Sequence, residues 1–126
     1  LCRLLLMNDS NYPWFILVPQ KEGVREVFEL SEAEQKQLMR ESSSFSQLIA
    51  KHFSADKINV AALGNVVSQL HIHHIVRYTD DPAWPAPVWG YADARAYSDL
   101  QIRELVDSLQ KILPDSFEFD GQLLNG

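Results

Sequence analysis

The chain has 126 residues, which suits one compact domain, and we expect a single domain over residues 1–126. Apolar residues make up 46% and charged residues 22%, close to the averages of globular proteins, so the composition excludes wholesale disorder. Eleven Lys and Arg oppose 17 Asp and Glu, a net charge of −6. This charge, without any basic run, argues against DNA as a partner and leaves room for a small phosphorylated ligand in a local pocket.

Cysteine content and apolar runs bear on the compartment. The longest apolar run, Trp14 to Val18, is far shorter than the roughly 20 residues of a membrane span, so no membrane association is expected. Cys2 is the only cysteine, which precludes an internal disulfide and favours a reducing compartment such as the cytoplasm. The chain starts at Leu1 rather than Met, and we expect that an N-terminal stretch is missing.

The first half of the chain predicts a β-hairpin followed by a helix. The apolar runs Leu1 to Met7 and Trp14 to Val18 flank a cluster of turn-forming residues, which predicts two antiparallel strands. Ser31-Glu32-Ala33-Glu34 matches a capping box, so a helix should begin there. Its residues at helical spacing along one stripe are Leu38, Phe45, Leu48, Ile49 and His52.

The second half predicts two more strands, a loop and a helix. Ile58 to Leu63 and Leu70 to Val76 are joined through Gly64-Asn65, which favours an antiparallel pair. The Pro- and Trp-rich stretch from Asp80 to Gly90 predicts an ordered loop with rigid bends. A second capping box at Ser98 predicts a helix that stops at Pro114. The tail to Gly126 has no clear secondary-structure pattern.

Three of the four histidines lie together in one predicted strand. Because side chains alternate along a strand, Gln69, His71 and His73 should share one face about 7 Å apart, with His74 on the apolar face. A neutral imidazole can act as nucleophile, acid or base near neutral pH, and a second one can donate to developing phosphate charge. His74 should instead hydrogen-bond a buried backbone or hydroxyl group.

A metal site is an alternative use of the same pair. His71 and His73 form a His-x-His pattern on a strand, which is a common ligand pair, but a metal needs a third ligand. The closest carboxylates are Asp80 and Asp81, in a loop that would have to fold back. We therefore expect no metal and keep a metalloenzyme as the weaker alternative.

At this point the sequence resembles a known family. The stretch from Asn59 to Arg77 resembles the signature of the histidine triad (HIT) superfamily, in which an Asn opens a strand, a Gly-Gln pair follows, and then comes His-φ-His-φ-His-φ-φ, with φ apolar. Gly64-Asn65 stands for the Gly-Gln pair, and Gln69, His71 and His73 for the three histidines. Upstream, Leu4 to Asp9, Tyr12 to Pro19 and Leu30 to Glu34 resemble the family's strand with its Asp-containing turn, the next strand and the following helix start.

The resemblance implies a fold and a function. The implied fold is α+β, an antiparallel sheet of about five strands with two main helices, and we expect a homodimer. Family members bind nucleotides, and many hydrolyse or transfer nucleotidyl groups. The resemblance therefore implies a nucleotide hydrolase or nucleotidyl transferase, similar to the diadenosine polyphosphate hydrolases, that cleaves a phosphoanhydride or phosphoramidate bond without a cofactor.

The resemblance also assigns roles to residues. His71 would attack the α-phosphorus and form a nucleotidyl-histidine, and His73 would donate to a phosphate oxygen. Asp9 would hold the ribose hydroxyls, and Asn59 is expected to contact substrate. Main-chain amides near Gly64 and Asn65 would bind phosphate, because Gly permits close approach.

Departures from the family pattern keep a second interpretation open. Gln69 replaces the first triad histidine, and an amide can hydrogen-bond but cannot titrate. Trp14 and Val66 stand where some relatives carry His and Ser. A non-catalytic, nucleotide-binding or regulatory protein is therefore the main alternative to an enzyme.

Three further side chains have two interpretations each. Trp84 or Trp89 would lie over a base or simply pack in the core. Arg77 would either steer phosphate or remain a solvated strand-end residue.

Overall fold

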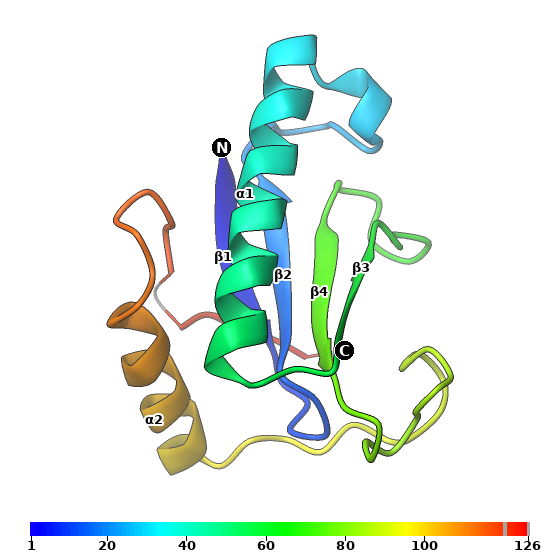
Figure 1. Cartoon of the computed structure of the whole chain (residues 1–126). Coiled ribbons are helices and arrows are strands. Elements are labelled where there is room, and N and C mark those ends of the chain that lie inside the picture. The colour runs from blue at the N-terminus through cyan, green and yellow to red at the C-terminus, as the bar shows by residue number, and fades with distance from the viewer. Residues whose placement is uncertain (120, 126) are drawn as a thin grey trace.

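The computed structural model describes residues 1–119 and 121–125 as an α+β fold with two α-helices and a five-stranded sheet (Figure 1). This is the class, and the number of strands and main helices, that the resemblance implies. None of the described helices is long and apolar enough to cross a membrane. In chain order the elements are β1 (Cys2–Met7), β2 (Trp14–Pro19), the short 3₁₀ helix η1 (Val27–Glu29), α1 (Glu32–His52), β3 (Lys57–Ala61), β4 (Ile72–Arg77), α2 (Asp99–Gln110) and β5 (Leu123–Leu124).

The sheet has the strand order β3-β4-β2-β1-β5. The predicted hairpin is present, with β1 antiparallel to β2 and Leu5 opposite Ile16. Strand β4 pairs antiparallel with both β2 and β3. Only β5 departs from the antiparallel expectation, because it returns from α2 by a long connection and lies parallel to β1. The sheet is therefore mixed.

Both helices begin where the sequence predicts. In α1, Ser31 and Glu34 form the reciprocal capping box, with the Glu34 amide donating to the Ser31 hydroxyl and the Ser31 amide donating to the Glu34 carboxylate. Ser98 and Gln101 do the same for α2. However, α2 ends at Gln110, short of the predicted Pro114, and the amides of Ile112 and Leu113 both donate to the carbonyl of Leu109 in the turn that follows.

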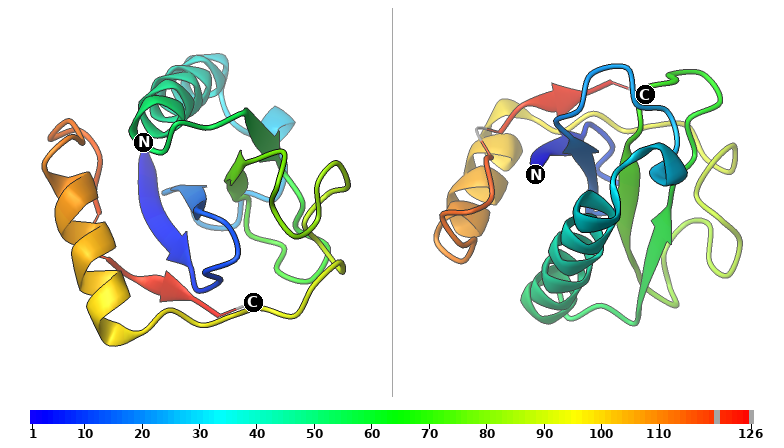
Figure 2. Two further views of the ribbon diagram at one scale, coloured as in Figure 1. Left: turned by 60° about the horizontal axis from the view of Figure 1, so that its bottom comes forward. Right: turned by 90° about the horizontal axis from the view of Figure 1, so that it is seen from above.

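The helices pack on one face of the sheet. Phe45 and Ile49 of α1 are fully buried against Phe15 and Leu17 of β2, as the apolar stripe predicts. His52, at the end of that stripe, is exposed instead. The opposite face carries a second apolar cluster and is crossed by the long segment between β4 and α2 (Figure 2). That second cluster contains Leu5, Tyr12, Trp14, Ile16, Ile75, Ala83 and Val88.

The connection between β3 and β4 differs from the predicted two-residue turn. Strand β3 ends at Ala61 and β4 begins at Ile72, so residues 62–71 form an irregular loop, which we call the 62–71 loop. Gln69 and His71 thus lie just before β4 rather than within it. No residue of this loop joins the β3–β4 ladder, whose pairing stops at Ala61 and His73. The antiparallel pairing of the two strands is as predicted.

Candidate active site

The 62–71 loop folds back over the ring of His71. A Cβ atom placed on Gly64 would lie 2.7 Å from the carbonyl oxygen of Val67 and 3.2 Å from Cε1 of His71. Only glycine leaves room for this approach, since the nearest obstacle is backbone that cannot simply rotate away. The backbone at Gly64 therefore borders the imidazole of His71 directly.

His71 is held in one tautomer by its own loop. Its Nδ1 lies 2.6 Å from the main-chain carbonyl oxygen of Gln69, and because a carbonyl only accepts, Nδ1 carries the proton. In the neutral ring Nε2 then keeps a free electron pair. The side chain is half-buried and lines two pockets, so this nitrogen belongs to an accessible and oriented base.

His73 is held in the opposite tautomer. The indole N–H of Trp14 donates to its Nδ1 at 3.0 Å, and its Nε2–H donates to the carbonyl oxygen of Leu63 at 3.2 Å. Indole nitrogen can only donate, so Nδ1 of His73 must be unprotonated. Burial lowers the pKa of His73, and the neighbouring His71 lowers it further. His73 is therefore a neutral ring whose donor is already used by Leu63.

The two rings lie close together although only one of them is in a strand. Their centroids are 5.1 Å apart in an edge-to-face arrangement, and Trp89 contacts the His73 ring at the same centroid distance. His73 lies on the β4 face that carries Ile75 and Arg77, opposite the helices. The predicted grouping of His71 and His73 is thus present in the structure.

His74 points to the other face, as the alternation predicts. It is fully buried, its Nδ1–H donates to the carbonyl of Ile72, and its Nε2 accepts from the hydroxyl of Ser42 in α1 at 2.7 Å. Burial lowers its pKa to about 4. His74 therefore joins α1 to the sheet and has no access to ligand.

Gln69 stands at the position of the first triad histidine in the resemblance. Its side-chain Nε2 donates to the carbonyl of Lys21, in the segment between β2 and η1, at 3.1 Å. The amide thus ties the 62–71 loop to that segment. Together with His71, Gln69 lines two pockets, one polar and one apolar.

A polar and an apolar pocket meet at His71. The polar pocket has a volume of about 100 Å³ and is lined by Arg25, Glu26, Ala62, Gly64, Asn65, Ser68, Gln69, Leu70 and His71. The apolar pocket has a volume of about 200 Å³ and is lined by Leu5, Val18, Val67, Gln69, His71 and Leu124. Arg25, Glu26 and Ser68 were not predicted as site residues, because they belong to no recognised motif and join His71 only in the lining of the polar pocket.

The main chain of the 62–71 loop offers unused donors. Within the described residues, no main-chain N–H group from Gly64 to Gln69 donates a hydrogen bond. Successive amides that point outward from a bend can bind an anion without any basic side chain. The predicted phosphate-binding amides of Gly64 and Asn65 are therefore free to accept a ligand beside His71.

Asp9 lies in a third pocket rather than beside His71. This pocket, of about 340 Å³, is lined by Met7, Asp9, Trp14, Val88, Trp89, Gly90, Ala92, Asp93 and Ala94. Oδ1 of Asp9 accepts from the amides of Asn11 at 3.0 Å and Arg95 at 3.3 Å. Trp14 and Trp89, packed edge to face with centroids 5.6 Å apart, stand in its wall. Of the two tryptophans considered for a base, Trp89 thus lines a pocket.

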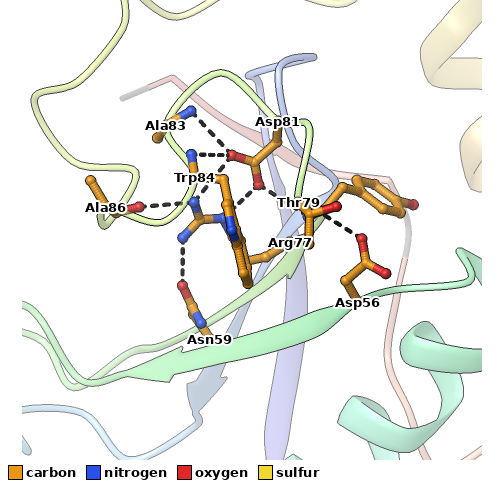
Figure 3. Close-up of polar contacts among 9 residues, drawn as sticks. Asp56, Asn59, Arg77, Thr79, Asp81, Ala83, Trp84 and Ala86 are labelled. Atoms are coloured by element: carbon orange, nitrogen blue, oxygen red, sulfur yellow. Dashed lines mark hydrogen bonds and ion pairs between the residues drawn. The ribbon is translucent and has the colours of Figure 1, made fainter.

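Arg77 is neither a phosphate ligand nor a solvated residue, which corrects both expectations. It is 1% exposed, and its guanidinium donates twice to the Asp81 carboxylate, at 2.8 and 3.1 Å (Figure 3). It also donates to the side chain of Asn59 and the carbonyl of Ala86, and it lies over the Trp84 ring. Asn59, predicted to contact substrate, is therefore occupied by Arg77, because the two lie on one face of neighbouring strands.

The Arg77–Asp81 pair also fixes the start of the Pro- and Trp-rich loop. Oδ1 of Asp81 accepts from the amides of Ala83 and Trp84, and its Oδ2 accepts from the amide of Tyr78 (Figure 3). Such a satisfied buried carboxylate holds one loop geometry. The same loop supplies Val88 and Trp89 to the third pocket, so Arg77 acts on that pocket only indirectly.

The described residues contain no group of three His, Cys, Asp or Glu side chains that could hold a metal ion. Asp81, one of the two carboxylates considered as a third ligand, is committed to Arg77. Nδ1 of His73, the unprotonated nitrogen of that ring, already accepts from the Trp14 indole, so His73 has no free electron pair for a metal ion. Nothing in this geometry favours the metalloenzyme alternative.

The chain combines a five-stranded α+β fold with two neighbouring histidines, one of which lines a pocket beside Gly64. Comparison with known proteins shows which family has this arrangement. The family model described as the HIT domain matches residues 1–80. The chain therefore belongs to the HIT domain family. Membership supports a nucleotide-binding or hydrolase function.

Solved structures agree with this assignment. A histidine triad protein from Marinobacter aquaeolei VT8 is 51% identical with a TM-score of 0.87, over 90% of this chain and 82% of that one. A histidine triad protein from Bradyrhizobium japonicum is 40% identical with a TM-score of 0.87, over 90% and 85%. One from Sinorhizobium meliloti 1021 is 42% identical with a TM-score of 0.86, over 90% and 84%. Among curated proteins, none matches the chain.

Proposed function

We propose that this protein is a nucleotide hydrolase or nucleotidyl transferase in which His71 forms a covalent nucleotidyl-histidine. The observation that carries the proposal is the environment of His71. Its Nδ1–H is held by the carbonyl of Gln69, which leaves the electron pair on Nε2 in a half-buried ring that lines two pockets. A base fixed in this way is prepared to attack phosphorus.

The two pockets suit the two parts of a nucleotide ligand. The apolar pocket, with Leu5 and Val18 in its wall, can take an apolar group such as a base, and the free amides from Gly64 to Gln69 can take phosphate oxygens. Both lie against His71. The substrates we propose are dinucleoside polyphosphates or related nucleotide conjugates with a phosphoanhydride or phosphoramidate bond.

The chemistry proceeds in two steps. Nε2 of His71 forms a bond to the α-phosphorus while the bond to the leaving group breaks and its electron pair departs with that group. Water or another acceptor then attacks the phosphorus, and the electron pair of the P–N bond returns to Nε2. The carbonyl of Gln69 stabilises the cationic ring between these steps, because it accepts from Nδ1–H throughout.

Intact-protein mass spectrometry after rapid mixing with diadenosine triphosphate tests this proposal. We expect an adduct of one adenylyl group on the wild type and none on His71→Ala. His52→Ala is the matched control, since His52 is exposed at the end of α1, away from both pockets. An adduct that survives in His71→Ala would overturn the assignment of the nucleophile.

The second candidate function is nucleotide binding without turnover, which the amide of Gln69 at a triad position favours. Calorimetric titration with a non-hydrolysable dinucleotide, run beside the adduct experiment, separates the two. Binding without any adduct or product would establish the non-catalytic alternative. The expected homodimer is tested separately by light scattering on the purified protein.

A further inference from the structure

The proposed function leaves open whether the bond cleaved at His71 is an anhydride or a phosphoramidate. The two differ in what must happen to the leaving group. A phosphate or polyphosphate group can depart as an anion, whereas an amine or a simple alcohol must gain a proton as the bond breaks. The question is therefore whether the site can supply that proton.

His73 cannot supply it. Its Nδ1 is the acceptor of the Trp14 indole N–H at 3.0 Å, so this nitrogen holds no proton, and its Nε2–H is bound to the carbonyl of Leu63. Protonating the ring on both nitrogens would place two N–H groups opposite each other in a region where Trp14 and His73 are 6% and 4% exposed. His73 thus stays neutral.

Among the other described residues that line the two pockets, Glu26 is the one side chain with an acidic group. The apolar pocket holds no acid besides the histidine itself, and in the polar pocket Gln69, Asn65 and Ser68 carry amides or a hydroxyl. Glu26 is the exception. It is exposed and has the formal negative charge of a glutamate, so it is an anion rather than a proton donor.

The same pocket contains one cation. Arg25 is exposed there, and among the described residues its side chain forms no ion pair or hydrogen bond. Its guanidinium is permanently charged and matches the oxygen pair of a departing phosphate. The polar pocket can therefore stabilise an anion that leaves, although it cannot protonate it.

We propose that the site cleaves bonds whose leaving group departs as an anion, which selects phosphoanhydrides over phosphoramidates, and that Arg25 stabilises the departing anion. This inference rests on the proposed function of His71. In the first step Nε2 bonds to phosphorus, the P–O bond breaks, and both electrons leave on the oxygen without a proton. In the second step water adds to phosphorus, the P–N electron pair returns to Nε2, and the proton lost by the water passes to solvent.

Two esters of AMP that differ only in the acidity of the leaving phenol test the preference for leaving groups that depart as anions. The p-nitrophenyl ester releases a stable anion and the phenyl ester does not, although the two have similar size. We expect kcat/KM to be higher for the nitrophenyl ester by about 100-fold or more. A general acid typically contributes at least this factor, and without one the phenyl ester loses that help with its poor leaving group. Adenosine 5′-phosphoramidate should be slower than diadenosine triphosphate by a similar factor.

Comparable rates for the two esters, or a phosphoramidate turned over as fast as the anhydride, would overturn the inference while leaving the nucleophile intact. Absence of any His71 adduct with the nitrophenyl ester would instead overturn the proposed function, and the inference with it. These two failures are therefore distinguishable in the same set of measurements.

Adjacent residues of opposite charge provide the matched variants. Arg25→Gln should lower kcat/KM for diadenosine triphosphate by about 10-fold, with a smaller effect on the nitrophenyl ester, because the nitrophenolate presents no phosphate oxygens. Glu26→Gln should raise turnover of the anhydride, since it removes a negative charge from the pocket that the anion enters. A selective loss of phenyl ester activity in Glu26→Gln would identify Glu26 as a proton donor and contradict the inference. Equal rates of anhydride cleavage by the wild type and Arg25→Gln would show that Arg25 does not stabilise the departing anion.

Discussion

The indole N–H of Trp14 in β2 donates to Nδ1 of His73 in β4 across 3.0 Å, with both side chains almost completely buried. This bond fixes which nitrogen of His73 carries the proton, and it makes Trp14 a positioning residue for the site. Trp14 occupies the place where some HIT relatives carry a histidine. A residue that can gain or lose a proton is thus replaced by one that can only donate a hydrogen bond to His73.

Replacing Trp14 by Phe should release Nδ1 of His73. We expect the pKa of His73 to rise toward its usual value and the free energy of unfolding to fall by about 2 kcal/mol, because a buried acceptor loses its donor. NMR titration of the histidine ring protons and urea unfolding measure the two effects. Trp89→Phe is the control, since Trp89 contacts the same ring only edge to face. An unchanged His73 titration in Trp14→Phe would show that the indole bond does not set its protonation.

The buried pair of His74 and Ser42 should make stability depend on pH. The pKa of His74 is about 4 in the folded protein and near 6.5 when unfolded, so between these values the unfolded chain binds the extra proton. Its contribution, about 3 kcal/mol, is present above pH 6.5 and is lost as the pH falls toward 4. Urea unfolding of wild type and His74→Gln at pH 7 and pH 4.5 measures the difference. Parallel pH dependence in the two proteins would contradict this assignment.

Breaking the Arg77–Asp81 pair should destabilise the domain strongly. Burial alone would raise the pKa of Asp81, but hydrogen bonds from Arg77 and two backbone amides lower it overall, so the carboxylate is ionised and supports the buried guanidinium. Asp81→Asn should reduce the free energy of unfolding by about 3 kcal/mol or more, because it leaves a buried charge without its partner. Asp80→Asn, exposed and adjacent, should change stability by less than about 0.5 kcal/mol. Similar losses in both variants, measured by urea unfolding, would show that the ion pair is not the cause.

Asp9 gives a test of the predicted ribose contact. Asn at this position can still accept from the amides of Asn11 and Arg95, so the turn should persist while the charge is lost. If the carboxylate holds ribose hydroxyls, Asp9→Asn should raise KM by about 10-fold for diadenosine triphosphate and have little effect on its 2′,3′-dideoxy analogue. Steady-state kinetics with the two substrates measure this. An equal rise for both sugars would assign Asp9 to the structure of the turn.

Elements encoded by local patterns were predictable from the sequence. The helix starts at Ser31 and Ser98 follow from capping boxes, and the burial of His74 against a hydroxyl follows from strand alternation. The two-residue β5 was not, because so short a strand leaves no periodic pattern, and neither was the end of α2. For α2 the residues before Pro114 continue the apolar spacing although the backbone no longer follows it.

For the candidate site, the sequence indicates which two histidines lie together, but it does not indicate the loop and the hydrogen bonds around them. The grouping of His71 and His73 follows from their spacing, whereas the 62–71 loop has no periodicity that would reveal its length. The bond from Trp14 to His73 depends on the register between β2 and β4, which only the folded sheet defines. The Arg77–Asp81 pair was visible as two charges four residues apart, but its burial depends on Asn59 and Trp84, which other segments supply.

The parallel pairing of β5 with β1 has a consequence for synthesis. Leu6 and Leu123 face each other across this pair although more than a hundred residues separate them in sequence, so the outer edge of β1 stays uncovered until Leu123 and Leu124 have emerged from the ribosome. An apolar strand with an open edge is a template for pairing with another chain. Aggregation should therefore be strongest while the chain is being synthesised, and weakest once Leu123 and Leu124 have paired with β1.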